Sequence, residues 1–172
     1  ISIGTKINST TGGQQQTDNG IIEKYCYNNN IAYCDTLGGL YEWNEAKQYS
    51  ALSKGVCPAG WHIPSKTEWS TLSSYLGGDG VSGGKIKQTG TANWSSPNTG
   101  ATNSSGFTGL AGGVRNYSDG SIYNKDYYGG FWSSTESTSN WAWYRMLEYD
   151  SDDLLEDDTW KNTGWSVRCL KN

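Results

Sequence analysis

The chain has 172 residues and a formal net charge of −4 at pH 7. This acidic balance argues against nucleic acid as a partner, because no basic stripe is present to neutralise phosphates. No apolar run reaches the roughly 18 residues that a membrane span needs, so we expect no membrane insertion. The length predicts a single domain over residues 1–172.

Aromatic residues dominate the apolar content, with nine Trp and twelve Tyr against two Phe and one Met. These large side chains can form a core from few residues while each keeps a polar group. Trp and Tyr are also favoured at recognition surfaces. The 23 glycines, together with abundant Ser, Asn and Thr, predict many turns and little long helix. We therefore expect a loop-rich α+β domain.

The four cysteines are Cys26, Cys34, Cys57 and Cys169. None lies in a CxxC pair, and the only histidine, His62, cannot complete a zinc-finger set. An even number without metal spacing favours disulfides and an exported protein. Of the three pairings, we expect Cys26–Cys34, which closes a short loop, and Cys57–Cys169, which ties the start of a central helical segment to the last strand. Four buried thiols in a cytosolic protein are the alternative.

The first third of the chain predicts short elements. Residues 1–20 suggest an edge strand and an extended loop, and residues 21–42 suggest two short strands around an Asn-rich turn. The chain opens without a charged and apolar leader, so an export signal would have been removed or would lie upstream. Asn44 is expected to cap a helix over residues 44–52, with these side chains facing inward: Ala46, Tyr49, and Ala51 or Leu52.

The strongest local signal is a helix that begins after Ser65. Glu68 follows three residues later, which is the spacing of a capping box, and Pro64 fixes the entry of the chain. Gly77–Gly78 is expected to end this helix. One helical face would carry Trp69, Leu72, Tyr75 and Leu76.

The second half predicts ordered loops and then strands. Residues 77–130 show no long periodic segment, which is unusual in a compact domain unless the segment is functional or packed as ordered loops. Asp119–Gly120 predicts a hairpin turn. Residues 141–149 and 164–171 read as strands. Between them we expect a loop within an acidic block formed by Glu148, Asp150, Asp152, Asp153, Glu156, Asp157 and Asp158.

Several segments occur in a fixed order: TDNGIIEKYCYNN, GGLYEWNEA, CPAGWHIPSKTEW, SPNTGATNSSGF, LAGGVRNYSDGS, FWSSTES, and AWYR followed by GWSVRCLK. Together they resemble the Fibrobacter-type major paralogous domain, a secreted bacterial module, over residues 20–172. The resemblance implies a C-type-lectin-like α+β fold with two helices packed on a small twisted antiparallel sheet, long irregular loops and neighbouring termini. It also implies a secreted, cell-surface or virion-associated protein.

The C-terminal part, residues 130–172, also resembles the variable proteins of diversity-generating retroelements. In those proteins chosen codons are rewritten while flanking residues stay fixed. The resemblance implies that AWYR and GWSVRC are frame, and that a C-terminal binding face displays Trp141, Met146, Glu148, Asp150, Asp152, Asp153, Leu155, Asp157, Asp158, Trp160 and Asn162.

Such a face would bind an external protein or glycan with cationic or donor-rich groups. Trp160 and Leu155 are expected to be the apolar anchors within a carboxylate rim. Trp143 and Trp165 are expected in the core, and period-two geometry sends Trp141 to the same face as Trp143. For Arg145 and Arg168, we expect stems packed on Trp or Tyr rings and heads paired with carboxylates.

Other chemistries fit the sequence less well. The run Asp150-Ser-Asp152-Asp153 begins like a calcium loop, but Leu155 and Lys161 stand where Gly and Glu belong, so we expect no metal or other cofactor. No motif selects a glycosidase carboxylate pair. His62 is expected to pack and to bond backbone, and paired cysteines would leave no thiol for chemistry of the formylglycine-generating type. We therefore expect no enzyme; a structural or adhesive surface module and a carbohydrate-acting enzyme are the alternatives.

Overall fold

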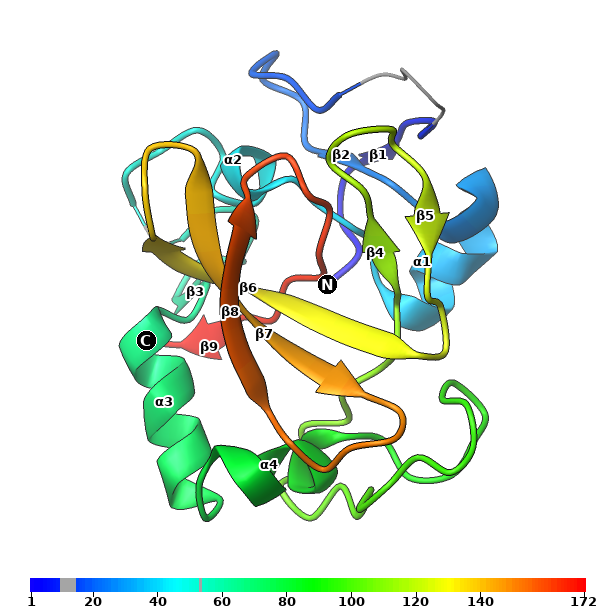
Figure 1. Ribbon diagram of the computed structural model, residues 1–172. Helices are drawn as coiled ribbons and strands as arrows, with labels where there is room; N and C mark the ends of the chain where they lie inside the picture. The colour runs from blue at the N-terminus through cyan, green and yellow to red at the C-terminus, as the bar shows by residue number, and fades with distance from the viewer. Residues whose placement is uncertain (10–14, 53) are drawn as a thin grey trace.

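The computed structural model describes residues 1–9, 15–52 and 54–172. The described chain forms a mixed α and β domain with short helices, small sheets and long loops (Figure 1). In chain order its elements are β1 (Thr5–Lys6), β2 (Glu23–Lys24), η1 (Tyr27–Asn29), α1 (Ile31–Leu37), α2 (Trp43–Ala46), β3 (Trp61–His62), α3 (Lys66–Tyr75), α4 (Asp79–Ile86), β4 (Val114–Arg115), β5 (Ile122–Tyr123), β6 (Tyr128–Glu136), β7 (Trp141–Glu148), β8 (Leu155–Trp160) and β9 (Leu170–Lys171).

The antiparallel sheet β6–β7–β8 is the centre of the fold. Successive side chains of a strand point to opposite faces, so each face of this sheet carries its own core. Phe131 and Leu147 belong to the cluster on the side of α3 and α4, whereas Trp132 and Tyr144 belong to the cluster on the other side. In Figure 1 the helices α3 and α4 lie below the sheet and the β4–β5 hairpin lies to its right.

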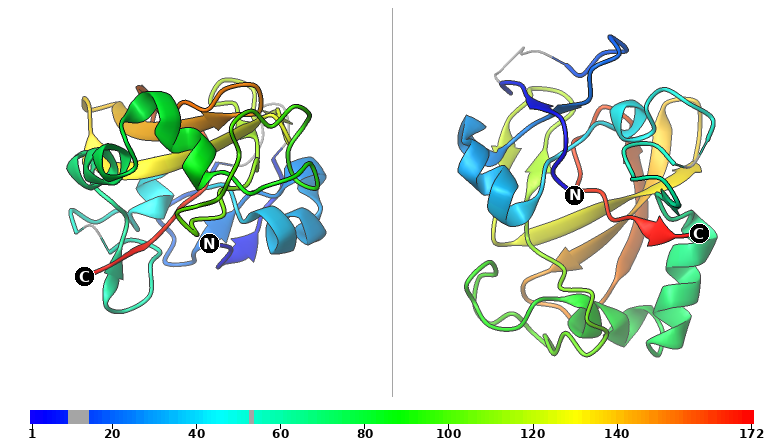
Figure 2. Two further views of the ribbon diagram at one scale, coloured as in Figure 1. Left: turned by 90° about the horizontal axis from the view of Figure 1, so that it is seen from below. Right: turned by 180° about the vertical axis from the view of Figure 1, so that it is seen from behind.

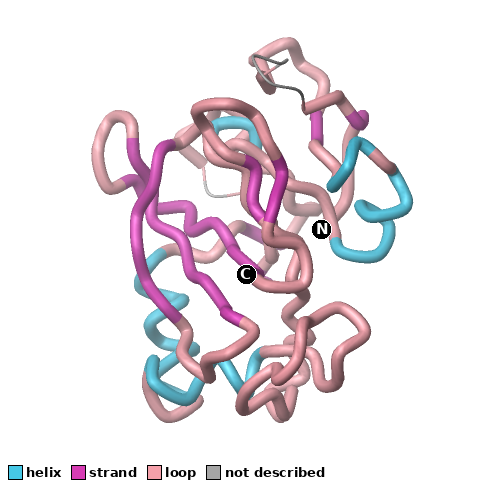
Figure 3. Tube along the Cα trace, turned by 45° about the vertical axis from the view of Figure 1, so that its right-hand side comes forward, coloured by secondary structure: helices cyan, strands magenta, loops and turns pink. Residues whose placement is uncertain are grey.

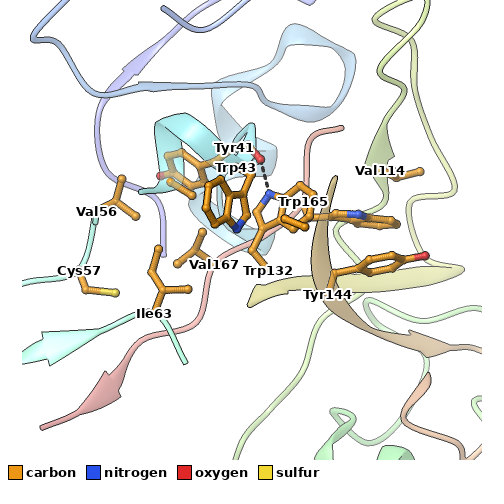
Figure 4. Close-up of a cluster of buried hydrophobic side chains, with 12 residues drawn as sticks. Tyr41, Trp43, Val56, Cys57, Ile63, Val114, Trp132, Tyr144, Trp165 and Val167 are labelled. Atoms are coloured by element: carbon orange, nitrogen blue, oxygen red, sulfur yellow. Dashed lines mark hydrogen bonds between the residues drawn. The ribbon is translucent and has the colours of Figure 1, made fainter. Parts of the chain in front are cut away.

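The first core joins the sheet to the N-terminal half of the chain (Figure 4). The Trp132 indole is fully buried and its Nε1 donates to the carbonyl oxygen of Tyr41 at 2.7 Å. Trp43 is similarly anchored, because its Nε1 donates to the carbonyl of Ser133 at 2.7 Å. Buried Trp N–H groups need such acceptors, and here the acceptors are main-chain carbonyls far away in sequence.

The long helix α3 confirms the predicted capping box. The Ser65 hydroxyl accepts from the Glu68 N–H and the Glu68 carboxylate accepts from the Ser65 N–H. Trp69 and Leu76 are buried as expected, but the prediction for Tyr75 is wrong, since it is 86% exposed. The inward stripe instead includes Ser73, whose hydroxyl lies 3.1 Å from that of Ser82 on α4. The sequence did not predict α4, and its packing sets the buried face of α3.

The helix predicted over residues 44–52 is shorter than expected. Helix α2 ends at Ala46, and Gln48 and Tyr49 both have φ +51°, which a continuing helix cannot contain. Ala46 is buried as predicted, but Leu52 is 71% exposed, and Tyr49 and Ala51 are exposed too. The cap position is Glu42 and not Asn44.

Residues 21–42 contain one predicted strand, β2, but the second is replaced by helix α1. The Asn30 side chain accepts from the Ala32 N–H, which provides the cap that starts this helix. The predicted Cys26–Cys34 disulfide is confirmed, with the two Cα atoms 5.2 Å apart. The predicted strand near the N-terminus is β1, which pairs with β2 in parallel; residues 10–14 of the following loop lie outside the described part.

The region predicted to lack long elements, residues 77–130, contains α4, β4, β5 and the start of β6, and its longest irregular stretch is residues 87–113 (Figure 3). Glycine allows close contacts around α4: a Cβ at Gly83 would lie 2.0 Å from the Asp153 carbonyl oxygen. The Asp119–Gly120 hairpin turn is confirmed between β4 and β5, which pair antiparallel. Gly120 has φ +74°, a conformation that glycine adopts without a Cβ penalty.

The C-terminal region differs most from expectation. The strand predicted over residues 141–149 is confirmed as β7, but the acidic block is not a loop throughout, because Leu155–Trp160 forms the edge strand β8. Residues 164–166 form single bridges with three distant segments rather than a continuous strand, residues 167–169 form none, and only Leu170–Lys171 pairs as β9. Because of these bridges the C-terminal segment passes through the middle of the molecule, and each bridged residue pairs with a different segment of the chain.

The second disulfide, Cys57–Cys169, is also confirmed, with Cα atoms 5.8 Å apart. It fixes β9 beside β3, which Figure 2 shows near the start of α3. The Ile1 amine donates to the Val167 carbonyl at 3.0 Å, so the first and last segments of the chain lie side by side. Within the described ranges, no helix is both long and apolar enough to span a bilayer.

Candidate ligand-binding face

A pocket of about 270 Å³ lies between the β4–β5 hairpin and the face of the central sheet that carries Tyr144. We call it the tyrosine pocket; it is lined by Val114, Asn116, Tyr117, Tyr123, Asn124, Tyr128, Tyr144, Met146, Thr159, Thr163 and Trp165. The hairpin contributes the two exposed rings, Tyr117 and Tyr123, which are 43% and 41% exposed. Five of its eleven lining residues are aromatic, and hydroxyl and carboxamide groups lie among them.

The floor of the tyrosine pocket is rigid. Trp165 stacks on Tyr144 with ring centroids 5.0 Å apart and planes at 18°. Both residues are more than nine-tenths buried. A Cβ at Gly130 would lie 2.1 Å from the Trp165 ring, so the glycine is what lets the indole lie flat on the sheet. Figure 4 shows Trp165 and Tyr144 beside Val114, at the edge of the first core.

Carboxylates flank this pocket on the sheet side. The strand register sets Asp157 opposite Tyr144 and Glu148 opposite Tyr128, so each pair shares the face that bears the pocket. Burial is the larger cause and the charge of Asp157 the next, and together they raise the pKa of Tyr144 to about 12. Burial and the charges of Glu148 and Asp150 raise the pKa of Tyr128 as well. We call Glu148, Asp150 and Asp157 the acidic rim.

Several polar groups of the pocket have no partner within the described residues. The Trp165 indole nitrogen is buried and has no hydrogen-bond acceptor. The hydroxyls of Tyr117, Tyr123 and Tyr144 also make no hydrogen bond there. A buried unpaired donor costs free energy unless something outside the chain satisfies it. The pocket is therefore equipped to accept hydrogen-bonding groups from a ligand.

A second pocket of about 360 Å³ adjoins the end of β8. We call it the amide pocket; it is lined by Gln15, Gln16, Glu42, Asn44, Tyr49, Ser139, Asn140, Trp160, Lys161 and Asn162. The carboxamides of Asn44 and Asn140 have no hydrogen-bond partner in residues 1–9, 15–52 and 54–172. Carboxamides both donate and accept, so this surface suits ligands rich in hydroxyl or amide groups.

Trp160 lies beside both pockets. Its ring stacks on Tyr117 at 5.7 Å and contacts Trp141 at 5.3 Å. It is half-buried rather than fully exposed, because these two rings cover it. The prediction of Trp143 as a core residue is wrong: its ring is half-buried, and the Lys66 ammonium lies 3.1 Å from the ring centroid. Trp165 was correctly predicted as core.

The predicted display positions are brought together only in part. Met146 lines the tyrosine pocket, Leu155 lies opposite it in the register, and Glu148, Asp150 and Asp157 belong to the rim. Trp160 and Asn162 line the amide pocket, with Trp141 against Trp160. Asp158 is on the other face of the sheet, where its carboxylate accepts from the Ser137 hydroxyl.

Asp152 and Asp153 lie away from both pockets, against α4. The Cβ of Asp152 packs where a side chain on Gly84 or Gly100 would lie, and the Asp153 carbonyl covers Gly83. Glu148, Asp150 and Asp152 act together on the Lys87 ammonium, which is fully buried. Burial lowers the pKa of Lys87 and these three charges oppose that effect.

Lys87 is held by main-chain oxygens. Its Nζ donates to the carbonyls of Thr99, Glu148 and Ser151 at 2.7, 2.8 and 2.6 Å. The ammonium thus joins the turn after β7 to the loop around Thr99. Where the structure describes the chain, no cluster of His, Cys, Asp or Glu is arranged to hold a metal ion.

Of the two arginines, Arg145 has the predicted carboxylate partners and, within the described chain, Arg168 does not. Arg145 is 2% exposed, and its guanidinium reaches Asp79 Oδ1 at 2.9 Å and Glu156 Oε2 at 2.6 Å. The Arg168 guanidinium lies 4.2 Å from the Phe107 ring and donates to the Phe107 carbonyl, with no carboxylate partner among the described residues. Its stacking partner is thus a phenylalanine rather than the predicted Trp or Tyr.

His62 is half-buried and bonds side chains rather than the predicted backbone. Its Nε2 lies 2.9 Å from Glu68 Oε1, and its Nδ1 lies 2.7 Å from Asn172 Oδ1. The Asn172 contact comes first among the causes that raise the pKa of His62, with burial opposing it. The imidazole thus links the cap of α3 to the end of β9.

Sequence reasoning missed the hairpin side of the tyrosine pocket. Tyr117, Tyr123 and the neighbouring Asn116 and Asn124 flank the Asp119–Gly120 turn that the sequence did predict. Their composition was a signal, because Tyr and Asn next to a tight turn are typical of recognition loops. Nothing in the sequence, however, indicated that this hairpin faces β7 and β8.

Comparisons with known proteins define the family. No curated protein and no solved structure matches the chain. The family model described as the Fibrobacter succinogenes major domain matches residues 4–171, which is nearly the whole sequence. All of the elements described above, from β1 to β9, lie within that range or end at its last residue. The chain therefore belongs to the Fibrobacter succinogenes major domain family.

Proposed function

We propose that this chain is a ligand-binding domain that recognises an external protein or glycan through the tyrosine pocket, the amide pocket and the Trp160 ring beside both. The observation that carries the proposal is the tyrosine pocket, where the Trp165 N–H and three phenolic hydroxyls have no partner in the described chain. Concave sites with aromatic walls and a few convergent polar groups are typical of ligand binding.

Rigidity supports a binding role. Two disulfides and the Trp-rich first core fix the strands behind the pocket. A preorganised surface loses little conformational freedom on association, which leaves more of the contact energy as affinity. All four cysteines are disulfide-bonded, so no thiol is free for nucleophilic chemistry. We therefore favour binding over catalysis.

We further propose a C-type-lectin-like fold and an extracellular setting. The fold proposal is supported by helices against a small antiparallel sheet, a long loop region, and first and last segments that lie side by side. The extracellular proposal is supported by the two disulfides, which persist in oxidising compartments.

The resemblance to variable proteins of diversity-generating retroelements extends the proposal. Strand β8 has a pairing partner on one side only, so the backbone ladder that substitutions along it can disturb is the one with β7. Codons 141–163 sequenced across copies and strains should differ while the AWYR and GWSVRC codons stay constant. Identical codons 141–163 in all copies and strains would mean that the binding surface is fixed and not diversified.

The binding proposal is tested with the full 172-residue chain on arrays of glycans and peptides. Each hit is then measured by titration against Tyr123→Ser, Trp160→Ala and, as a control, Tyr75→Ser. Tyr75 is 86% exposed on α3, outside both pockets. The two face variants should weaken binding at least about tenfold, the effect of losing an aromatic anchor, while the control binds normally. Hits that tolerate both face variants would contradict the proposal.

A further inference from the structure

Four tyrosines line the tyrosine pocket, and the Trp165 indole is stacked on one of them, Tyr144. Tyr117, Tyr123, Tyr128, Tyr144 and Trp165 all contribute to its lining. The face of an aromatic ring carries partial negative charge, which attracts cations and favours weakly hydrated ones. Several ring faces around one small volume therefore make a site for a positively charged group with an apolar surface.

The acidic rim strengthens this preference. Asp157 lies opposite Tyr144 and Glu148 lies opposite Tyr128, and directly opposed residues have Cβ atoms about 4.5–5.5 Å apart. Asp157 is exposed, so its carboxylate is open to a ligand. The charges of the rim reach the phenols, since they contribute to the raised pKa values of Tyr144 and Tyr128.

Within the described chain, the Lys87 ammonium acts on Glu148 and Asp150 of the rim, but Lys87 is not part of the pocket. The lining contains no Lys, Arg or His. Three basic residues adjoin lining residues in sequence, and each is paired with another carboxylate. Their ion pairs are Arg115–Glu42 at 3.1 Å, Lys125–Asp126 at 2.5 Å and Arg145–Glu156 at 2.6 Å.

The unpaired polar groups add a second requirement on the ligand. The hydroxyls of Tyr117, Tyr123 and Tyr144 make no hydrogen bond within the described chain, so each can donate to an oxygen of a ligand. A hard metal ion is a poor occupant, because it prefers a cage of oxygen ligands to aromatic rings. An organic cation with an oxygen a few bonds from its nitrogen meets both conditions.

We propose that the tyrosine pocket binds an alkylammonium group of the ligand, with the positive nitrogen against the tyrosine faces and acidic rim and a nearby oxygen accepting from one of the unbonded tyrosine hydroxyls. This inference rests on the proposed binding function and names the chemical class that the pocket selects. It fits a ligand of small or medium size, given a pocket of about 270 Å³.

Choline and its uncharged isostere 3,3-dimethyl-1-butanol give a direct test. Both molecules have the same shape and one hydroxyl, and only choline carries a positive charge. The full chain is titrated with each while the tryptophan indole N–H resonances are followed by NMR. Choline should bind at least about tenfold more tightly, as expected for a cation in an aromatic site. Equal affinities, or binding of neither molecule, would overturn the inference.

Two substitutions and two controls assign the effect to the pocket. Tyr123→Leu removes a ring but keeps an apolar side chain, and Asp157→Asn removes a rim charge from an exposed position. Both substitutions should weaken choline binding several-fold. Asp157→Asn should leave the affinity for the uncharged isostere unchanged. The controls are Tyr75→Leu and Asp18→Asn, which alter an exposed ring and an exposed carboxylate outside the pocket.

Folding of each variant is checked by thermal unfolding. If Tyr123→Leu fails to fold, Asp157→Asn still decides the outcome, because its side chain lies on the exposed edge strand. Choline binding that survives Asp157→Asn unchanged would overturn the role of the rim. The ammonium preference and the proposed binding function can fail separately. If an array hit has no positive nitrogen and its binding is weakened by Tyr123→Ser, the binding function stands and only the ammonium preference is refuted.

Discussion

At the scale of single residues, the binding face depends on the absence of a side chain at Gly130. The Trp165 ring occupies the volume where a Cβ would stand, and the same ring is stacked on Tyr144. A close-packed arrangement of this kind tolerates little added volume. One methyl group can therefore move the floor of the tyrosine pocket.

We predict that Gly130→Ala lowers the free energy of unfolding by about 3 kcal/mol or more, near the upper end of overpacking effects, because neither ring has room to shift. Urea unfolding followed by tryptophan fluorescence measures the change. Gly80→Ala is the matched control: its Cβ would meet only Asp153 Oδ1 at 3.7 Å, inside helix α4. It should be neutral or stabilising by up to about 1 kcal/mol. A similar loss in both variants would contradict the packing argument.

Glu42 is the second residue with a measurable consequence. It is 7% exposed, accepts from the Tyr25 hydroxyl at 2.9 Å and pairs with Arg115. Burial raises the pKa of Glu42 from 4.5 to about 7, despite the opposing effects of Tyr25 and Arg115. The folded protein thus binds a proton at this site more tightly than the unfolded chain does.

The stabilising contribution of that proton is complete below pH 4.5 and is lost as the pH rises towards about 7. We predict a decline of about 1–3 kcal/mol in the unfolding free energy from this group over that interval. The measurement is the difference between wild type and Glu42→Gln in chemical unfolding from pH 4.5 to 8. The difference should change with pH in this direction, and a constant difference would show that the carboxyl does not titrate there.

At the scale of elements, the predictable parts are those whose signals are local. Helix α3 was found because its cap, its apolar spacing and its terminal glycines all lie within residues 64–78. Helix α1 was missed because it depends on the Asn30 cap within an Asn-rich run that reads equally as a turn. Strand β8 was missed because its acidic side chains suit a loop, and only pairing with β7 makes it a strand. Carboxylates on an edge strand also discourage pairing with other chains.

The two disulfides join elements at very different separations, 8 and 112 residues. In the chain-entropy model the longer loop contributes about 4–5 kcal/mol and the shorter about 2–3 kcal/mol. We predict that replacing Cys57 and Cys169 by serine lowers the melting temperature more than replacing Cys26 and Cys34. Calorimetry of the two double variants, both compared with wild type, makes the test. Equal losses would mean that local packing, and not chain entropy, sets the contribution of each bridge.

At the scale of the whole molecule, the candidate face combines segments that are remote in sequence. Residues 114–128 supply one wall of the tyrosine pocket and residues 144–165 supply the other. The sequence indicated the second wall through its strands and acidic block. The first wall could not be predicted, because its position follows from the β4–β5 hairpin and from single bridges such as Arg115–Gly164. Contacts of this kind leave no periodic pattern in the chain.

The loops around Lys87 are likewise held by contacts between segments that are remote in sequence. We predict that Lys87→Met lowers the unfolding free energy by about 2–5 kcal/mol, because three buried carbonyls lose a charged donor. Thermal unfolding of wild type with excess calcium or with EDTA should give the same midpoint in both. A midpoint that falls with EDTA would show that an ion, and not the ammonium, organises these loops.

Lys87 has a consequence for where such a domain can work. A bound metal is shared with the surroundings, so the order it imposes depends on its concentration outside the protein. The ammonium of Lys87 is covalently part of the chain and reaches the turn after β7 in every folded copy. The geometry next to the acidic rim is thus inherited with the polypeptide and does not vary with the mineral content of the medium.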